Sequence, residues 1–227
     1  DTPGLQGGYS SYELPATPGG GGYAQNGQQH MGGGGGAITL DVGNVCMVDG
    51  IIDVRGQTGG SNSGGGAGGS VQLNAINAFL GSGIILASGG NGGPGGYHKA
   101  GGGGGGRVAI YCKNDETAEP SKISIKVHGG LTNAGNNPSL SDIYHAGAGT
   151  IFQDCGALSK SLRLDNSGVD RKWIDASLPT SIVETVTKEN AVIEMGMLEL
   201  LGGASVNFSP LGLPPKVNVV IDTSKVI

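Results

Sequence analysis

Residues 37–106 contain two copies of one sequence unit, and this repetition constrains the fold more than any other feature of the chain. Placing Ile38–Val42 over Val71–Ala75, at an offset of 33 residues, also places Gly50–Val54 over Gly83–Ala87 without a gap. Each unit contains a short alternating strand, a turn, a second short strand and a glycine tract. A sequence period of about 20 to 50 residues is typical of stacked repeats, in which each unit buries its apolar side against its neighbours. The repetition therefore predicts a stacked β architecture.

The alternation of apolar and polar residues predicts the strands of each unit. Ile38–Val42 has the period of two that is typical of a strand with one buried face. The pattern returns in two further units, although a polar insertion separates the strands of the third. We expect Leu40, Leu73 and Ile110 to lie above one another in one column. The predicted units are residues 37–69, 70–106, 107–149 and 150–168.

Glycine occupies 48 of 227 positions, and 42 of these lie in residues 1–149. The tracts have no Gly-X-Y period, which excludes collagen. Residues 1–36 form a glycine-rich N-terminal segment without helical or strand period, and by composition alone they resemble disordered chain. Alternatively, their tracts pack side by side as extended polyproline-II-like or polyglycine-like segments, because only glycine allows backbones to approach so closely. The recurrence of tracts at Gly64–Gly69 and Gly101–Gly106 favours this packing.

Residues 169–227 have ordinary composition and short runs rich in β-branched residues. Such spacing is typical of either further solenoid coils or a small β-sandwich. Leu162 and Leu164 continue the register of the repeats, which favours the solenoid. The predicted fold class is therefore all-β: a right-handed parallel β-solenoid, over 37–168 and onward, with packed glycine-rich segments.

Charge and hydropathy argue against two classes of partner. The net charge is −5, and Lys and Arg do not cluster, so neither nucleic acid nor an anionic membrane surface is an expected partner. No apolar run approaches the roughly 20 residues needed to cross a bilayer, so we expect no membrane insertion. The chain begins without Met and ends in a strand-like run, which suggests a processed product or a segment of something longer.

The units beginning at Gly-Gly-Ser70-Val71 and Gly105-Gly106-Arg107-Val108 resemble the glycine-rich repeats of large cell-surface and secreted proteins. The resemblance covers residues 32–168. It implies a parallel β-helix in an adhesin, a cell-coat component or a filament such as a hair-like appendage. It also implies an extracellular or cell-surface location.

Cys112 and Cys155 occupy the same place in consecutive units. Equivalent positions on neighbouring coils lie about 4.8 Å apart, within reach of a disulfide, whose Cα atoms are usually about 4.4 to 6.8 Å apart. We predict a Cys112–Cys155 bridge, which would indicate an oxidising compartment. The alternative is two stacked buried thiols. Cys46 would remain, either buried like its counterpart Phe79 or joined to another chain.

The sequence predicts no catalytic, cofactor or metal site. His30, His98, His128 and His145 are scattered, no Cys or His has zinc-site spacing, and the six-glycine run lacks the Gly-Lys-Ser/Thr ending of a phosphate loop. No repeated acidic ladder emerges of the kind that polysaccharide-cleaving β-helices use. Asn207-Phe208-Ser209 is a glycosylation sequon, although Pro210 weakens it.

These observations predict a non-enzymatic structural or adhesive module, forming part of a filament, coat or appendage. Its expected partners are copies of itself or other coat and filament proteins, and glycans are a further candidate. Open end coils or glycine faces would add subunits by edge pairing. The alternatives are a carbohydrate-binding or polysaccharide-cleaving β-helix and a largely disordered chain.

Overall fold

The computed structural model describes residues 11–24, 30–94, 100–113, 122–132, 146–155, 160–166, 180–182, 190–201, 204, 206–208 and 216–221. Every regular element in these ranges is a β-strand. The strands are β1 (Ala37–Val42), β2 (Val45–Met47), β3 (Ile51–Asp53), β4 (Ser70–Ala75), β5 (Ala78–Leu80), β6 (Ile84–Leu86), β7 (Arg107–Cys112), β8 (Ser124–Lys126), β9 (Gly149–Cys155), β10 (Ser161–Asp165), β11 (Thr180–Ile182), β12 (Asn190–Met195), β13 (Met197–Leu201), β14 (Val206–Phe208) and β15 (Lys216–Ile221).

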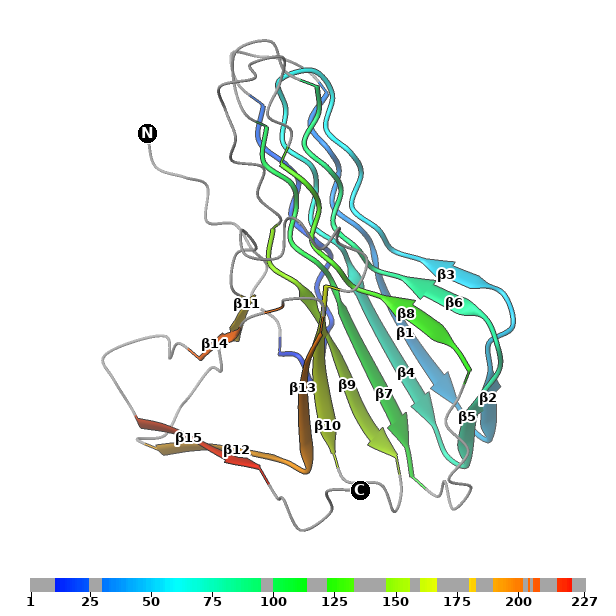
Figure 1. Ribbon diagram of the computed structural model, residues 1–227. Coiled ribbons are helices and arrows are strands. Elements are labelled where there is room, and N and C mark those ends of the chain that lie inside the picture. The colour runs from blue at the N-terminus through cyan, green and yellow to red at the C-terminus, as the bar shows by residue number, and fades with distance from the viewer. Residues whose placement is uncertain are drawn as a thin grey trace.

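The first strands of successive repeats lie side by side and run parallel, as the alignment of the units predicts (Figure 1). Leu40 pairs with Leu73, and Leu73 pairs with Ile110, so the three residues form one column. The second strands pair in the same way, in a three-stranded sheet of order β3-β6-β8 and a two-stranded sheet of β2 and β5. The first three repeats therefore stack unit on unit.

The predicted parallel β-solenoid is wrong. The largest sheet has the order β1-β4-β7-β9-β10-β13 and is mixed, because β10 runs antiparallel to β9 and pairs Leu162 with Phe152. Only residues 156–160 connect these two strands. A parallel connection needs a crossover of about a dozen residues or more, so this short segment forces the chain to turn back. Leu162 and Leu164 therefore do not continue the repeat in register.

The C-terminal strands likewise form open sheets instead of the predicted further solenoid coils. β13 joins the edge of the large sheet by pairing parallel with β10. β11 pairs with β14 and β12 pairs with β15, each in a two-stranded parallel sheet. The sheets of the described residues are thus several and open, and none closes into the coil of a solenoid.

The inner strands of the large sheet, β4, β7 and β9, are largely buried on both faces. Val71, Leu73, Val108 and Ile110 point into a core that they share with the second strands of the repeats. On the opposite face, Tyr12, Ala109, Phe152, Leu162 and Leu164 form a second cluster. The segment that carries Tyr12 is held there by two hydrogen bonds of 2.6 Å, from the Tyr111 hydroxyl to the Glu13 carbonyl oxygen and from the Ser70 hydroxyl to the Thr17 carbonyl oxygen. Part of the glycine-rich N-terminal segment is therefore packed on the sheet.

The glycine tracts hydrogen-bond to one another through their backbones. The N–H groups of residues 64–69 donate in turn to three neighbouring segments, residues 20–23, 101–104 and 54–57. Each segment therefore accepts a hydrogen bond from every third residue. The bonds run from Gly64 to Tyr23, Gly65 to Gly101, Gly66 to Gln57, Ala67 to Gly20, Gly68 to Gly104 and Gly69 to Val54, at 2.7–3.0 Å. Three residues per turn without internal hydrogen bonds is the geometry of a polyproline-II helix, and here neighbouring backbones take the place of the water that usually solvates it. A β-carbon at Gly66 would collide with the carbonyl oxygen of Gly33.

Candidate interaction surface at the first repeat

The first repeat has a free edge on all three of its strands. β1 pairs only with β4, β2 only with β5 and β3 only with β6 among the described residues. We call the outer side of β1, β2 and β3 the first-repeat edge. An edge strand presents a row of unpaired N–H and C=O groups that can template pairing with another chain. This edge is therefore an incomplete repeat interface.

Side-chain exposure changes sharply between the first repeat and the next. Leu40 is 40% exposed, whereas Leu73 and Ile110, in the same column, are fully buried. The three residues are chemically similar and point to the same side of the sheet, so their sequence does not explain the difference. Leu73 and Ile110 have a strand on each side, whereas Leu40 has a strand on one side only. The open edge is thus what exposes Leu40.

Other apolar residues extend this exposed surface along the first-repeat edge. Val45 is 37% exposed, Met47 is 64% exposed and Ile51 is 67% exposed. Contiguous exposed apolar surface on a soluble protein marks an interaction site more often than scattered single residues do. Together with Leu40, these residues place apolar surface on each of the three edge strands.

Polar side chains of the first repeat form hydrogen bonds with the second repeat. The Asn74 side-chain amide donates to the Asp41 carboxylate at 2.6 Å, and the Asn77 amide donates to the Asn44 side-chain oxygen at 2.6 Å. The Ser82 backbone N–H donates to the Asp49 carboxylate at 2.9 Å. These bonds join residues 33 positions apart, so the sequence period is also the period of polar side-chain ladders.

The acidic residue on β3 is held ionised by its neighbour. The Arg55 guanidinium donates to both carboxylate oxygens of Asp53, at 2.7–3.2 Å. Hydrogen bonds from Arg55 lower the pKa of Asp53 below its ordinary value. Both side chains are solvent-exposed, so the pair contributes little to stability, and the Arg55 cation balances the Asp53 anion.

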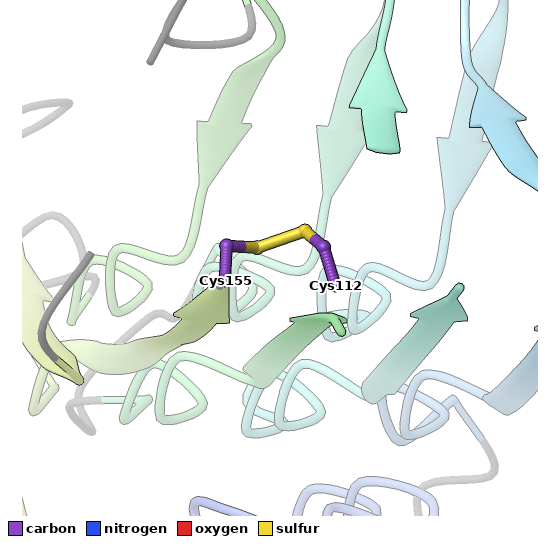
Figure 2. Close-up of a disulfide and its surroundings, with 2 residues drawn as sticks. All are labelled: Cys112 and Cys155. Carbon is purple, nitrogen blue, oxygen red and sulfur yellow. A yellow bond between two sulfur atoms is a disulfide. The ribbon is translucent and has the colours of Figure 1, made fainter. Parts of the chain in front are cut away.

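A disulfide joins Cys112 and Cys155 at the ends of β7 and β9, with their Cα atoms 4.3 Å apart (Figure 2). The two residues are direct partners in the parallel pairing of these strands, which is where the alignment of the units places them. Cys46 is free and buried opposite Phe79, and burial raises the pKa of its thiol. The covalent link thus lies in the third and fourth units, away from the first-repeat edge.

The remaining predicted site residue lies in the C-terminal strands. Asn207 belongs to β14, where its backbone pairs with Ser181, and its glycosylation stays a prediction. His98 and His145 lie outside the described residues. Across the part of the chain that the structure describes, no three His, Cys, Asp or Glu side chains form a group able to hold a metal ion. The same part contains no helix long and apolar enough to cross a membrane.

The fold and the first-repeat edge define a β-rich protein of stacked glycine-rich repeats with one disulfide. No family model matches the sequence, and comparisons with curated proteins and with solved structures find no match. Sequence reasoning anticipated open end coils in general. It did not single out the apolar residues of the first repeat, because their counterparts in the second repeat carry the same pattern and are buried or half-buried.

Proposed function

We propose that this chain is an extracellular structural module that associates with copies of itself through the first-repeat edge, as a subunit of a filament, coat or appendage. The observation that carries the proposal is the exposure of Leu40 beside its buried counterpart Leu73. A second strand laid on β1 would complete the column and cover Leu40 as β1 and β7 cover Leu73. It would also pair the free backbone groups of the edge.

The apolar surface and the backbone act together in this association. Complete burial of an aliphatic side chain contributes about 1.5–3 kcal/mol, and only part of each exposed side chain remains to be buried. Association costs about 4–15 kcal/mol in lost freedom of motion. Apolar burial of Leu40, Val45, Met47 and Ile51 alone would therefore give weak binding. Strand pairing along the edge supplies the additional interaction and fixes the orientation.

The disulfide supports the extracellular part of the proposal. Disulfides form and persist in oxidising environments and are rare in reducing ones. The Cys112–Cys155 bridge links two strands that are already paired, so it secures the stack where the repeat pattern ends. A module that bears load outside the cell gains from such a covalent link.

Sedimentation velocity over a range of protein concentrations, combined with negative-stain microscopy, tests the proposal. We expect wild-type protein to form larger species as concentration rises. Ile51→Glu, which places a charge among the apolar residues of the edge, should weaken association. Leu14→Glu is the matched control, because Leu14 is also exposed but lies in the N-terminal segment. A wild-type protein that stays monomeric at every concentration contradicts the proposal.

A further inference from the structure

The three-stranded sheet has a free strand at each of its two ends. Its order is β3-β6-β8, so β3 and β8 each pair on one side only among the described residues. Ser124 and Lys126 of β8 are exposed, as are Ile51 and Asp53 of β3. All pairings in this sheet are parallel, so one end could continue the pattern that the other begins.

The two free strands carry opposite charges at the same register positions. Asp53 pairs with Leu86, and Leu86 pairs with Lys126, so Asp53 and Lys126 occupy the two ends of one column. The same register, extended two residues before β8, aligns Lys122 with Ser82, whose backbone N–H donates to Asp49. The Ser124 N–H donates to the Gly83 carbonyl oxygen at 3.0 Å, which continues the pairing in that direction.

We propose that the β8 edge of one copy pairs in parallel with the β3 edge of a second copy, so that Lys126 lies beside Asp53 and Lys122 lies beside Asp49. Neighbouring strands are about 4.8 Å apart, and opposite charges at directly opposed positions attract. The inference rests on the proposed self-association and identifies the surface of the partner copy that meets β3, one of the three strands of the first-repeat edge.

Charge selects this arrangement over the symmetric ones. Two β3 edges facing each other would bring Asp49 and Asp53 of one copy close to the same acidic residues of its partner. Two β8 edges would do the same with Lys122 and Lys126. Arg55 offsets part of the repulsion between two β3 edges, because it pairs with Asp53, but only the head-to-tail contact places a lysine beside each aspartate. A head-to-tail contact leaves a free edge on each end of the pair, so it permits further growth unless the rotation closes a ring.

Asp53 keeps capacity for a second partner. Three donors of Arg55, its backbone N–H, Nε and Nη2, already bond to the carboxylate, but two carboxylate oxygens offer about four acceptor positions, which leaves room for one further donor. The structure gives Lys122 and Lys126 no ion-pair partner among the described residues. Both lysines are therefore available to a carboxylate of another copy.

A buried asparagine sets the limit of this pairing. The N–H groups of Gly56 and Gly89, which follow β3 and β6, donate to carbonyl oxygens of the next repeat, Ser88 and His128, at 3.0 Å. The equivalent N–H of Gly129 donates instead to the side-chain oxygen of Asn166 at 3.1 Å. Asn166 thus takes the place of a further repeat after β8. The contact between copies is confined to β8 and the residues that precede it.

Two charge-reversal variants test the inference by sedimentation velocity. Asp53→Lys and Lys126→Asp should each weaken self-association about tenfold or more, because each places like charges in one column of the contact. An equimolar mixture of the two variants should recover association, because every contact between unlike variants then joins opposite charges. Exposed ion pairs are screened by salt, so wild-type association should weaken at high ionic strength.

Lys113→Asp is the matched control, because Lys113 is exposed but follows β7, an internal strand of the large sheet. It should leave association unchanged. If wild-type protein associates and the two reversals do not weaken it, the head-to-tail contact is overturned while the proposed function stands. If both reversals weaken association and the mixture fails to recover it, the contact is overturned as well. A monomeric wild-type protein overturns both proposals.

Discussion

Gly103 and Gly104 are adjacent in one glycine tract but lie in opposite environments. A β-carbon at Gly103 would collide with the carbonyl group of Gly66, whereas a β-carbon at Gly104 would have no atom within 4 Å. The difference follows from the three-residue rotation of the tract, which turns one residue toward a neighbouring backbone and the next away from it.

Gly103→Ala should therefore destabilise the protein, and Gly104→Ala should not. Forcing an extra methyl group into packed structure typically costs about 1–3 kcal/mol. Alanine at an unstrained open position is neutral or stabilises by up to about 1 kcal/mol, because it restricts the unfolded chain. Denaturant unfolding of the two variants measures the difference. Equal stability would show that the tracts are not close-packed.

Reduction of the Cys112–Cys155 disulfide should lower the free energy of unfolding. The bridge closes a loop with a sequence separation of 43, and the chain-entropy model gives about 4 kcal/mol for a loop of this length. Denaturant unfolding with and without reductant measures the loss. The double variant Cys112→Ser, Cys155→Ser should have the same lowered free energy of unfolding with and without reductant. A reductant effect that persists in this variant would point to Cys46 instead.

Asn166→Ala should leave the N–H of Gly129 without its hydrogen-bond acceptor. Asn166 is fully buried, and its side chain satisfies the N–H of Gly129. Leaving a buried donor unpaired costs about 1–3 kcal/mol. Amide hydrogen exchange should show lost protection at Gly129, whereas Gly56, whose partner is a backbone carbonyl, keeps its protection. Unchanged exchange at Gly129 would contradict the assigned role of Asn166.

Stability should fall in alkaline solution because of Tyr111. Burial, followed by the charges of Glu13 and Asp154, raises the pKa of Tyr111 to about 12. The pKa of an exposed tyrosine is about 10, so the unfolded chain loses this proton first. The contribution of neutral Tyr111 is therefore complete below about pH 10 and is lost as pH rises toward 12. The Tyr111 hydroxyl then no longer donates to the Glu13 carbonyl oxygen.

Thermal unfolding between neutral pH and pH of about 12 measures this loss. Tyr111→Phe is the control, because it removes the titrating group while keeping the ring near Phe152. The variant should be less stable at neutral pH and should show a smaller alkaline decline. An identical decline in both proteins would assign the effect to other groups.

The repeat alignment could predict the columns of the stack because period and register are sequence properties. Once Ile38 is placed over Val71, the same offset fixes Leu40 over Leu73, and a continued register brings Cys112 beside Cys155. The alignment failed after β9. There the direction of β10 depends on a five-residue connection, 156–160, and not on the apolar pattern of Leu162 and Leu164.

The candidate surface depends even more on the tertiary structure. Leu40 and Leu73 cannot be distinguished by pattern, and only the stacking order shows which of them has a neighbour on one side. The sequence also does not show that Lys126 and Asp53 occupy the same register position. The insertion in the third unit changes the spacing, so β6 and β8 are offset by 40 residues where β3 and β6 are offset by 33.

Local periodicity and the absence of side chains are enough to predict the β-rich repeat, the column of stacked residues and the glycine tracts. They do not predict where the stack ends, which strands are edges or which charges meet in one register. Those properties depend on how many neighbours each strand has. A residue's neighbours across a sheet are set by chain connections, not by the residues beside it in the sequence.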